Sequence, residues 1–341
     1  MVNVMFFSGA LLATVVSIYL LAPLAGRVGL IDRPCQRKQH DGEIPLVGGV
    51  CIFLAMLPAM FMQWGEANGG LVAVAFALMV LGAVDDRFHL SARVRLVLQL
   101  AAVMALFWMD VSLHDLGDLF GFGRVELHGL QDFLITAIVV VGVVNAVNMI
   151  DGVDGLAGTL MAVAATALCA LSLWAGCDEV IPITVALLGA LVGFLLFNLR
   201  HSFRDRAAIF LGDSGSMFIG FLLVIVMMRL LDYSEGRVKP VSMIWVLAVP
   251  LIDMGAVIVR RLTSGLSPMA ADRNHLHHIL MRHGLSPSQV VGVLFGAAIV
   301  FAAIGVMATI YQWSDWLLFW GYWLCVGLVA FVFRAQAEAA H

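Results

Sequence analysis

Long apolar segments recur along almost the whole chain, and no other feature constrains the fold as strongly. A helix needs about 20 mostly apolar residues to cross a bilayer, and the chain contains eleven segments of roughly that length. They begin near residues 3, 46, 69, 94, 131, 156, 180, 214, 240, 288 and 313. The sequence therefore predicts an all-α, polytopic integral membrane protein with about 11 transmembrane helices.

Composition excludes the main alternative classes. Of the 341 residues, 62% are hydrophobic and 12% are charged, whereas soluble domains carry about 25% charged residues. That balance excludes a soluble enzyme and a disordered chain. The five cysteines form no CxxC pair, so neither a disulfide framework nor a cysteine metal site is indicated. The net charge of -4, without a long basic block, argues against a nucleic-acid partner.

Basic residues fall mainly on one side of the expected membrane. Fifteen of the 19 lysines and arginines lie in one set of alternate loops and the C-terminal tail. Loops rich in lysine and arginine stay preferentially in the cytoplasm. We therefore expect a periplasmic N-terminus and a cytoplasmic C-terminus, an arrangement that needs an odd number of spans.

The two sets of loops also differ in chemistry. The expected cytoplasmic loops collect nearly all the polar side chains that can carry out a reaction, so an active site is expected on that face. Most of the opposite loops are short. One longer segment there, residues 111–132, alternates around Gly121-Phe122-Gly123 and predicts a small β-hairpin.

Two adjacent carboxylates, Asp85 and Asp86, lie where an apolar segment reaches the cytoplasmic surface. Charged groups within membrane segments are costly and tend to be functional. Such a pair can hold a divalent cation, or one carboxylate can accept a proton while the other orients it. A solvated helix end is the alternative interpretation.

A second polar cluster joins two apolar segments, with the sequence Asn145-Ala-Val-Asn148-Met-Ile-Asp151-Gly-Val-Asp154. Carboxylate and amide oxygens are ligands of hard cations such as Mg²⁺, which also bridge substrate phosphates. The alternative is that these residues only cap two helices. Four such residues at three-residue spacing exceed what two caps need, and the pattern therefore favours a functional site for such a cation.

A third motif, Gly212-Asp213-Ser214-Gly215, opens an apolar segment after a basic loop. The first backbone N–H groups of a helix bind phosphates well, and Asp213 could ligate a metal on such a phosphate. The motif lacks the Gly-Lys-Ser/Thr of a Walker sequence. By itself it is equally compatible with an ordinary helix start.

The segment 272–284 predicts an amphipathic helix that Asp272 caps and Gly284 ends. Its four histidines and two arginines form a cationic surface suited to a diphosphate. A zinc site and a solvated helix are the alternatives, although no HExxH or cysteine partner is nearby. Upstream, Asp253 lies inside a span, and Arg260 or Arg261 is its expected partner.

In this order, the four motifs resemble those of the polyprenyl-phosphate N-acetylhexosamine-1-phosphate transferases, from about Gly29 to Pro287. The loop Arg37-Lys38-Gln-His40 and the stretch Asp272-Arg273-Asn-His275-Leu-His277-His278 are most similar to the WecA-type branch. The muramoyl-pentapeptide branch usually has a lysine soon after the aspartate pair. Here His89 and Arg93 occupy that neighbourhood, which disfavours that branch.

The resemblance implies a role for each motif. The lipid-phosphate set also includes basic residues of the first cytoplasmic loop, which the positive-inside rule alone could explain. By role, the expected residues are Asp85 and Asp86 for catalysis; Asp213 and Asn148 for Mg²⁺, with Mn²⁺ as an alternative; Asp151, Asp154 and Asn145 for the nucleotide; Arg273, His275, His277 and His278 for the diphosphate and sugar; and Arg93, His40 and Lys38 for the lipid phosphate.

The resemblance also implies a reaction. N-acetylglucosamine 1-phosphate would pass from UDP-N-acetylglucosamine to undecaprenyl phosphate in the bacterial inner membrane, as the first membrane step of envelope polysaccharide synthesis. Residues 1–341 would form a single transmembrane catalytic domain embedded in the lipid bilayer. Another UDP-N-acetylhexosamine as donor, and a cation-coupled transporter, are the alternatives. The sequence leaves the oligomeric state open, including a homodimer.

Overall fold

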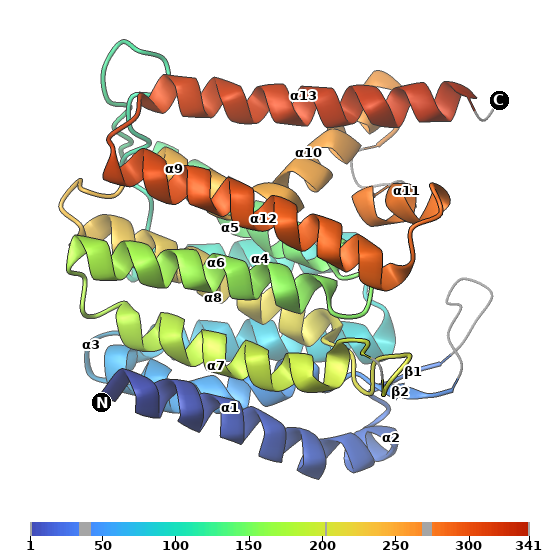
Figure 1. The fold of residues 1–341 in the computed structure, drawn as a ribbon. Coiled ribbons are helices and arrows are strands. Elements are labelled where there is room, and N and C mark those ends of the chain that lie inside the picture. The colour runs from blue at the N-terminus through green and yellow to red at the C-terminus, as the bar shows by residue number, and fades with distance from the viewer. Residues whose placement is uncertain (1, 34–41, 202, 268–274, 340–341) are drawn as a thin grey trace.

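The structure is a computed structural model that describes residues 2–33, 42–201, 203–267 and 275–339. Its helices lie roughly side by side in one bundle, with the start of α1 and the end of α13 at opposite ends (Figure 1). The elements are α1 (Val2–Leu21), η1 (Ala22–Leu24), α2 (Ala25–Val28), β1 (Ile31–Asp32), β2 (Ile44–Pro45), α3 (Gly48–Phe88), α4 (Ala92–Trp108), α5 (Leu130–Ile150), α6 (Leu156–Ala175), α7 (Ile181–Asn198), α8 (Gly212–Tyr233), α9 (Pro240–Val246), α10 (Ala248–Thr263), α11 (Leu276–Arg282), α12 (Pro287–Ile310) and α13 (Asp315–Ala339).

The 41 helical residues of α3 fold back on themselves. The rings of Phe53 and Phe76 lie 5.8 Å apart between centroids, whereas 23 residues of straight helix would separate them by about 35 Å. The two halves, Gly48–Gly65 and Gly69–Phe88, are therefore two antiparallel spans. Both the beginning and the end of α3 lie at one end of the bundle, which we call the polar end because Asp85 and Asp86 are there.

Nine segments of the described chain are long and apolar enough to cross a membrane. A tenth span is formed if α9 and α10 are counted together, although they meet at 86°. Pro250 explains this bend, because it has no N–H to donate to the carbonyl of Val246, so the hydrogen-bond ladder of α9 stops there, whereas a proline is tolerated in the first turn of α10. The predicted all-α polytopic membrane protein is confirmed, with nine or ten candidate spans.

The remaining predicted span, near residue 94, corresponds to α4. At 17 residues it is about 26 Å long, which is shorter than the roughly 30 Å hydrocarbon core. It nevertheless runs between the two ends of the bundle. Arg95 in its first turn contacts Asp85, and Met109, just after its last turn, lies against Gly70 at the opposite end.

Helix α8 forms the centre of the bundle and packs against α3, α5 and α6. Seventeen of its 22 residues are buried, as expected for a helix that is apolar on all sides. Its first turn touches α3 closely, since a Cβ on Gly82 would lie 2.3 Å from the carbonyl oxygen of Asp213. Small residues permit such an approach, which brings the end of α3 to the start of α8.

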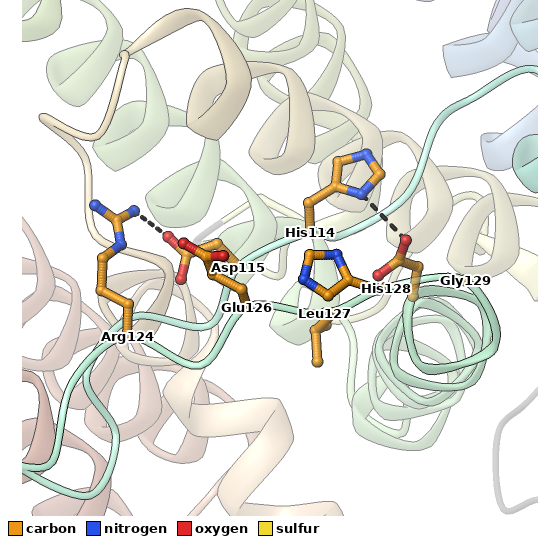
Figure 2. Close-up of a pocket in the computed structure, with 8 residues that line it drawn as sticks. His114, Asp115, Arg124, Glu126, Leu127, His128 and Gly129 are labelled. Atoms are coloured by element: carbon orange, nitrogen blue, oxygen red, sulfur yellow. Dashed lines mark hydrogen bonds and ion pairs between the residues drawn. The ribbon is translucent and has the colours of Figure 1, made fainter.

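Short antiparallel pairings also occur between the helices of the described chain. Strands β1 and β2 pair Ile31 with Pro45 and Asp32 with Ile44, a pairing that the sequence analysis did not predict. In the predicted hairpin segment 111–132, Asp115 bridges Glu126. The hairpin lies at the end opposite the polar end and lines a pocket of about 420 Å³ (Figure 2).

Candidate active site

Three helix ends meet at the polar end of the bundle. Asp86 comes from the end of α3, Asn148 from the last turn of α5, and Asp213 from the first turn of α8. The Asn148 amide contacts Asp213 Oδ1, and Asp86 Oδ1 accepts a hydrogen bond of 2.8 Å from the Asp213 backbone N–H. Residues far apart in the sequence therefore form one cluster of oxygen-rich side chains.

Asp86 caps helix α8. Its two carboxylate oxygens accept from the backbone N–H groups of Asp213, at 2.8 Å, and Ser214, at 3.2 Å. Gly212 makes room, because a Cβ there would lie 2.6 Å from Asp86 Oδ2. An anion is favourable at this end of the helix dipole. Of the two interpretations that the motif left open, the structure favours an ordinary helix start over a phosphate site, since Asp86 already accepts from these two N–H groups.

The other carboxylate of the pair, Asp85, is 3% exposed. Its Oδ1 accepts from the Leu90 backbone N–H at 2.7 Å, and its Oδ2 accepts from Arg95 Nη1 at 2.8 Å. Arg95 Nη1 also lies 3.9 Å from Asp213 Oδ2. The positive charge of one guanidinium therefore offsets the negative charge of carboxylates on two different helices.

The sequence analysis selected Arg93 and missed Arg95. Arg93 is exposed, whereas Arg95 is partly buried against the cluster. The signal was present, because Arg95 and the buried Gln99 are four residues apart and therefore share a face of α4. Asn145 donates to Gln99 Oε1 at 2.9 Å, which turns this predicted nucleotide residue toward α4.

Asp154 is engaged with the loop that precedes α8. Its Oδ2 accepts from Arg200 Nε at 2.8 Å and from the Ala207 backbone N–H at 3.0 Å. Nearby, the buried Asn198 accepts from the Gly155 N–H at 2.7 Å and donates to the Ile209 carbonyl at 2.8 Å. These bonds join the α5–α6 turn to the loop that leads into Asp213.

The raised pKa of Asp151 indicates an excess of negative charge in the cluster. It is the C-cap of α5, and burial together with the carboxylates of Asp213 and Asp154 raises its pKa to about 7. A divalent cation would relieve this repulsion, so the residues fit Mg²⁺. Within the described chain no three His, Cys, Asp or Glu side chains converge on a metal position. In proteins Mg²⁺ commonly binds through one or two carboxylates together with substrate phosphates and water.

The histidine segment differs from the expected cationic helix. Helix α11 spans Leu276–Arg282. His277 is 1% exposed, and burial together with the neighbouring His278 and His275 lowers its pKa to about 3. His277 is therefore neutral at physiological pH, and its inclusion in a cationic surface is corrected. Its ring fills the space beside Gly152, where a Cβ would lie 2.3 Å from Nε2.

Asp253 also has a different partner from the one expected. Its Oδ2 lies 2.8 Å from His275 Nδ1, and its Oδ1 accepts from the Leu276 N–H at 2.7 Å. The expected partner, Arg260 or Arg261, is replaced by the start of α11. Lys38, His40 and Arg273 lie outside the described residues, so their predicted roles stay predictions.

Comparison with known proteins identifies the family of this chain. Residues 69–231 match the model of glycosyl transferase family 4. Proteins named undecaprenyl-phosphate alpha-N-acetylglucosaminyl 1-phosphate transferase align with most of the chain. The Haemophilus influenzae protein is 34% identical over 323 residues, 93% of this chain and 89% of the relative. The Pasteurella multocida protein is 35% identical over 321 residues, covering 93% and 88%.

The corresponding protein of Escherichia coli strain K12 is 33% identical over 300 residues, which are 87% of this chain and 81% of the relative. The chain belongs to glycosyl transferase family 4. This family 4 protein is a membrane phosphoglycosyl transferase with multiple spans. Membership decides between the enzyme and the transporter in favour of the enzyme, and the expected family resemblance is confirmed.

Proposed function

We propose that this family 4 transferase moves N-acetylglucosamine 1-phosphate from UDP-N-acetylglucosamine to undecaprenyl phosphate, giving undecaprenyl-diphospho-N-acetylglucosamine and UMP. The names of relatives that are about 34% identical over about 90% of the chain support this assignment. The observation that carries it is the meeting of Asp85, Asn148 and Asp213 at one end of the bundle. A different UDP-N-acetylhexosamine is the alternative donor.

The experiment combines purified protein, Mg²⁺ and undecaprenyl phosphate with a panel of UDP-sugars, and follows UMP release. We expect UDP-N-acetylglucosamine to give the highest kcat/KM. A higher value with another UDP-N-acetylhexosamine would change the donor assignment but keep the reaction. Failure of every UDP-sugar, with intact protein and lipid acceptor present, would contradict the reaction itself.

The reaction needs two anionic phosphates to approach each other. An oxygen of the lipid phosphate forms a bond to the sugar-linked phosphorus, and the bond from that phosphorus to the UMP oxygen breaks. Asp213 and Asn148 would hold Mg²⁺, which when bound neutralises charge on the diphosphate. For that role the Asn148 amide must turn its oxygen toward the metal, because its nitrogen now faces Asp213.

The chain's own residues supply the remaining charge balance. Arg95 holds Asp85 at 2.8 Å and reaches toward Asp213, which fixes the acidic group beside the expected path of the lipid phosphate. Arg93, His40 and Lys38 are proposed to meet that phosphate from the surface. Asp151 and Asn145 are proposed on the nucleotide side, where Asp154 contributes by holding Arg200.

We expect direct attack by the lipid phosphate rather than a covalent aspartyl intermediate. The second pKa of a phosphate monoester is near 6, so the acceptor is largely ionised without a base. Labelled UMP should therefore not exchange into the UDP-sugar after all lipid acceptor and product have been stripped from the enzyme. Robust exchange that is lost in Asp85→Asn or Asp86→Asn would instead identify a carboxylate nucleophile.

We also propose that α4 is an eleventh span, with the N-terminus outside and the C-terminus in the cytoplasm. The path of α4 between the two ends of the bundle and the positions of the chain ends in Figure 1 support the odd number. A reporter fused after His341 should be active only as a cytoplasmic fusion. Efficient periplasmic activity of that fusion would contradict the orientation.

A further inference from the structure

Helix α11 follows His275 and contains His277 and His278, and its position depends on the neighbouring helices. It has seven residues, and isolated helices this short are not stable in water. Its apolar side packs through Ile279 with Ala256 and Val257 of α10 and with Phe333 of α13. Contacts with neighbouring helices therefore decide where the histidine side chains lie.

The polar contact at the start of α11 is Asp253. This carboxylate is 1% exposed on α10, and both of its oxygens are used at the point where α11 begins. One accepts the Leu276 backbone N–H, and the other lies 2.8 Å from His275 Nδ1. Because an ionised carboxylate only accepts hydrogen bonds, the ring must carry its proton on Nδ1. Nε2 is then the ring nitrogen available to a ligand.

The same helix is also seated against the carboxylate cluster. The rings of His275 and His277 are parallel within 4°, with centroids 5.7 Å apart, and His277 packs on Gly152 beside Asp151. A shift at Asp253 would therefore move His275 relative to the site that surrounds Asp151. Helix α10 also packs directly against α5, which carries Asn148.

We propose that Asp253 is a positioning residue, which fixes the orientation and the Nδ1-protonated state of His275 so that Nε2 faces the sugar diphosphate. This inference rests on the proposed function and on the predicted role of His275 in binding the diphosphate and sugar. Asp253 itself touches no substrate and acts through the imidazole ring, as carboxylates do when they orient histidines in other sites.

Asp253→Asn separates the two contacts. An asparagine side chain has one acceptor oxygen for two donors, the Leu276 N–H and the His275 Nδ1–H. Either the His275 ring changes to the tautomer with its proton on Nε2, or the Leu276 N–H loses its hydrogen bond to residue 253. We expect a loss of about ten- to hundredfold in kcat/KM for the UDP-sugar, carried mainly by a raised KM, with little change in the KM for undecaprenyl phosphate.

A double-mutant cycle with His275→Ala tests whether Asp253 acts through the ring. In the Asp253→Asn/His275→Ala variant the asparagine oxygen is free to accept the Leu276 N–H, so its kcat/KM should equal that of His275→Ala alone. His275→Ala leaves a buried carboxylate without its ring donor, which is destabilising. The double variant should therefore unfold at a higher temperature than His275→Ala.

The matched control is another aspartate–histidine pair, in which the aspartate is buried and the histidine is exposed. Asp132 Oδ2 lies 3.3 Å from His114 Nδ1 at the opposite end of the bundle, and Asp132→Asn should keep wild-type kinetics. Additive losses in the cycle, or wild-type kinetics in Asp253→Asn, would overturn the proposal. Each comparison uses the UDP-sugar that the wild-type protein turns over, so inactivity of the wild type would count against the proposed function instead.

Discussion

Asp213→Ala is expected to abolish Mg²⁺-dependent UMP release while leaving the fold intact. The side chain is the proposed metal ligand, and metal stabilisation of transferring phosphates contributes several kcal/mol, which corresponds to a loss of more than about hundredfold. The backbone N–H that Asp86 accepts stays in place in this variant. The start of α8 therefore keeps its cap, and the thermal unfolding temperature in detergent should change little.

The measurement is UMP release across a Mg²⁺ titration, together with thermal unfolding. Asp232→Ala is the matched control, since this exposed carboxylate lies on the same helix at the opposite end. The control should keep the wild-type rate and Mg²⁺ dependence. Near wild-type turnover of Asp213→Ala at ordinary Mg²⁺ concentrations would show that Asp213 does not hold the metal.

Asp86→Ala is expected to lower both activity and stability. It removes the acceptor for two backbone N–H groups at a buried helix start, which costs about 1–2 kcal/mol for a lost cap. Asp213 is in that turn, and a displacement of about 1 Å at a reacting centre can reduce the rate about hundredfold. Asp86→Asn keeps an acceptor oxygen and should recover part of the unfolding temperature.

Comparison of the two aspartate variants separates positioning from chemistry. Asp213→Ala should lose turnover without a fall in unfolding temperature, whereas Asp86→Ala should lose both. An Asp86→Ala protein that unfolds at the wild-type temperature but is inactive would show that Asp86 acts mainly in the reaction rather than as a cap of α8. Thermal unfolding and UMP release should be measured on the same preparations.

Much of the architecture could be predicted because it depends on local sequence. The apolar segments matched described helices, since each span must satisfy its own backbone hydrogen bonds within the membrane. The order of the motifs led to the correct family. The two departures also have local causes. Helix α4 is short, and Pro250 interrupts the ladder between α9 and α10.

The candidate site was predictable as a set of residues and not as a set of contacts. The motifs at Asp86, Asn148 and Asp213 were identified, and the structure brings these three together. The sequence analysis could not show that Asp86 accepts from the backbone N–H groups of Asp213 and Ser214, which could otherwise bind a phosphate. It also missed Arg95, although the helical spacing between Arg95 and Gln99 could have indicated it.

The sequence by itself determined the membrane class, the order of the motifs and the family, because hydrophobic length and motif spacing are encoded along the chain. Only the tertiary structure decided that Asp253 pairs with His275, 22 residues away, and that His277 is buried beside Gly152. Such pairings depend on how helices pack, and burial then sets whether a histidine is charged. Periodicity predicts which face of a helix is apolar, but it does not identify the residue that faces it.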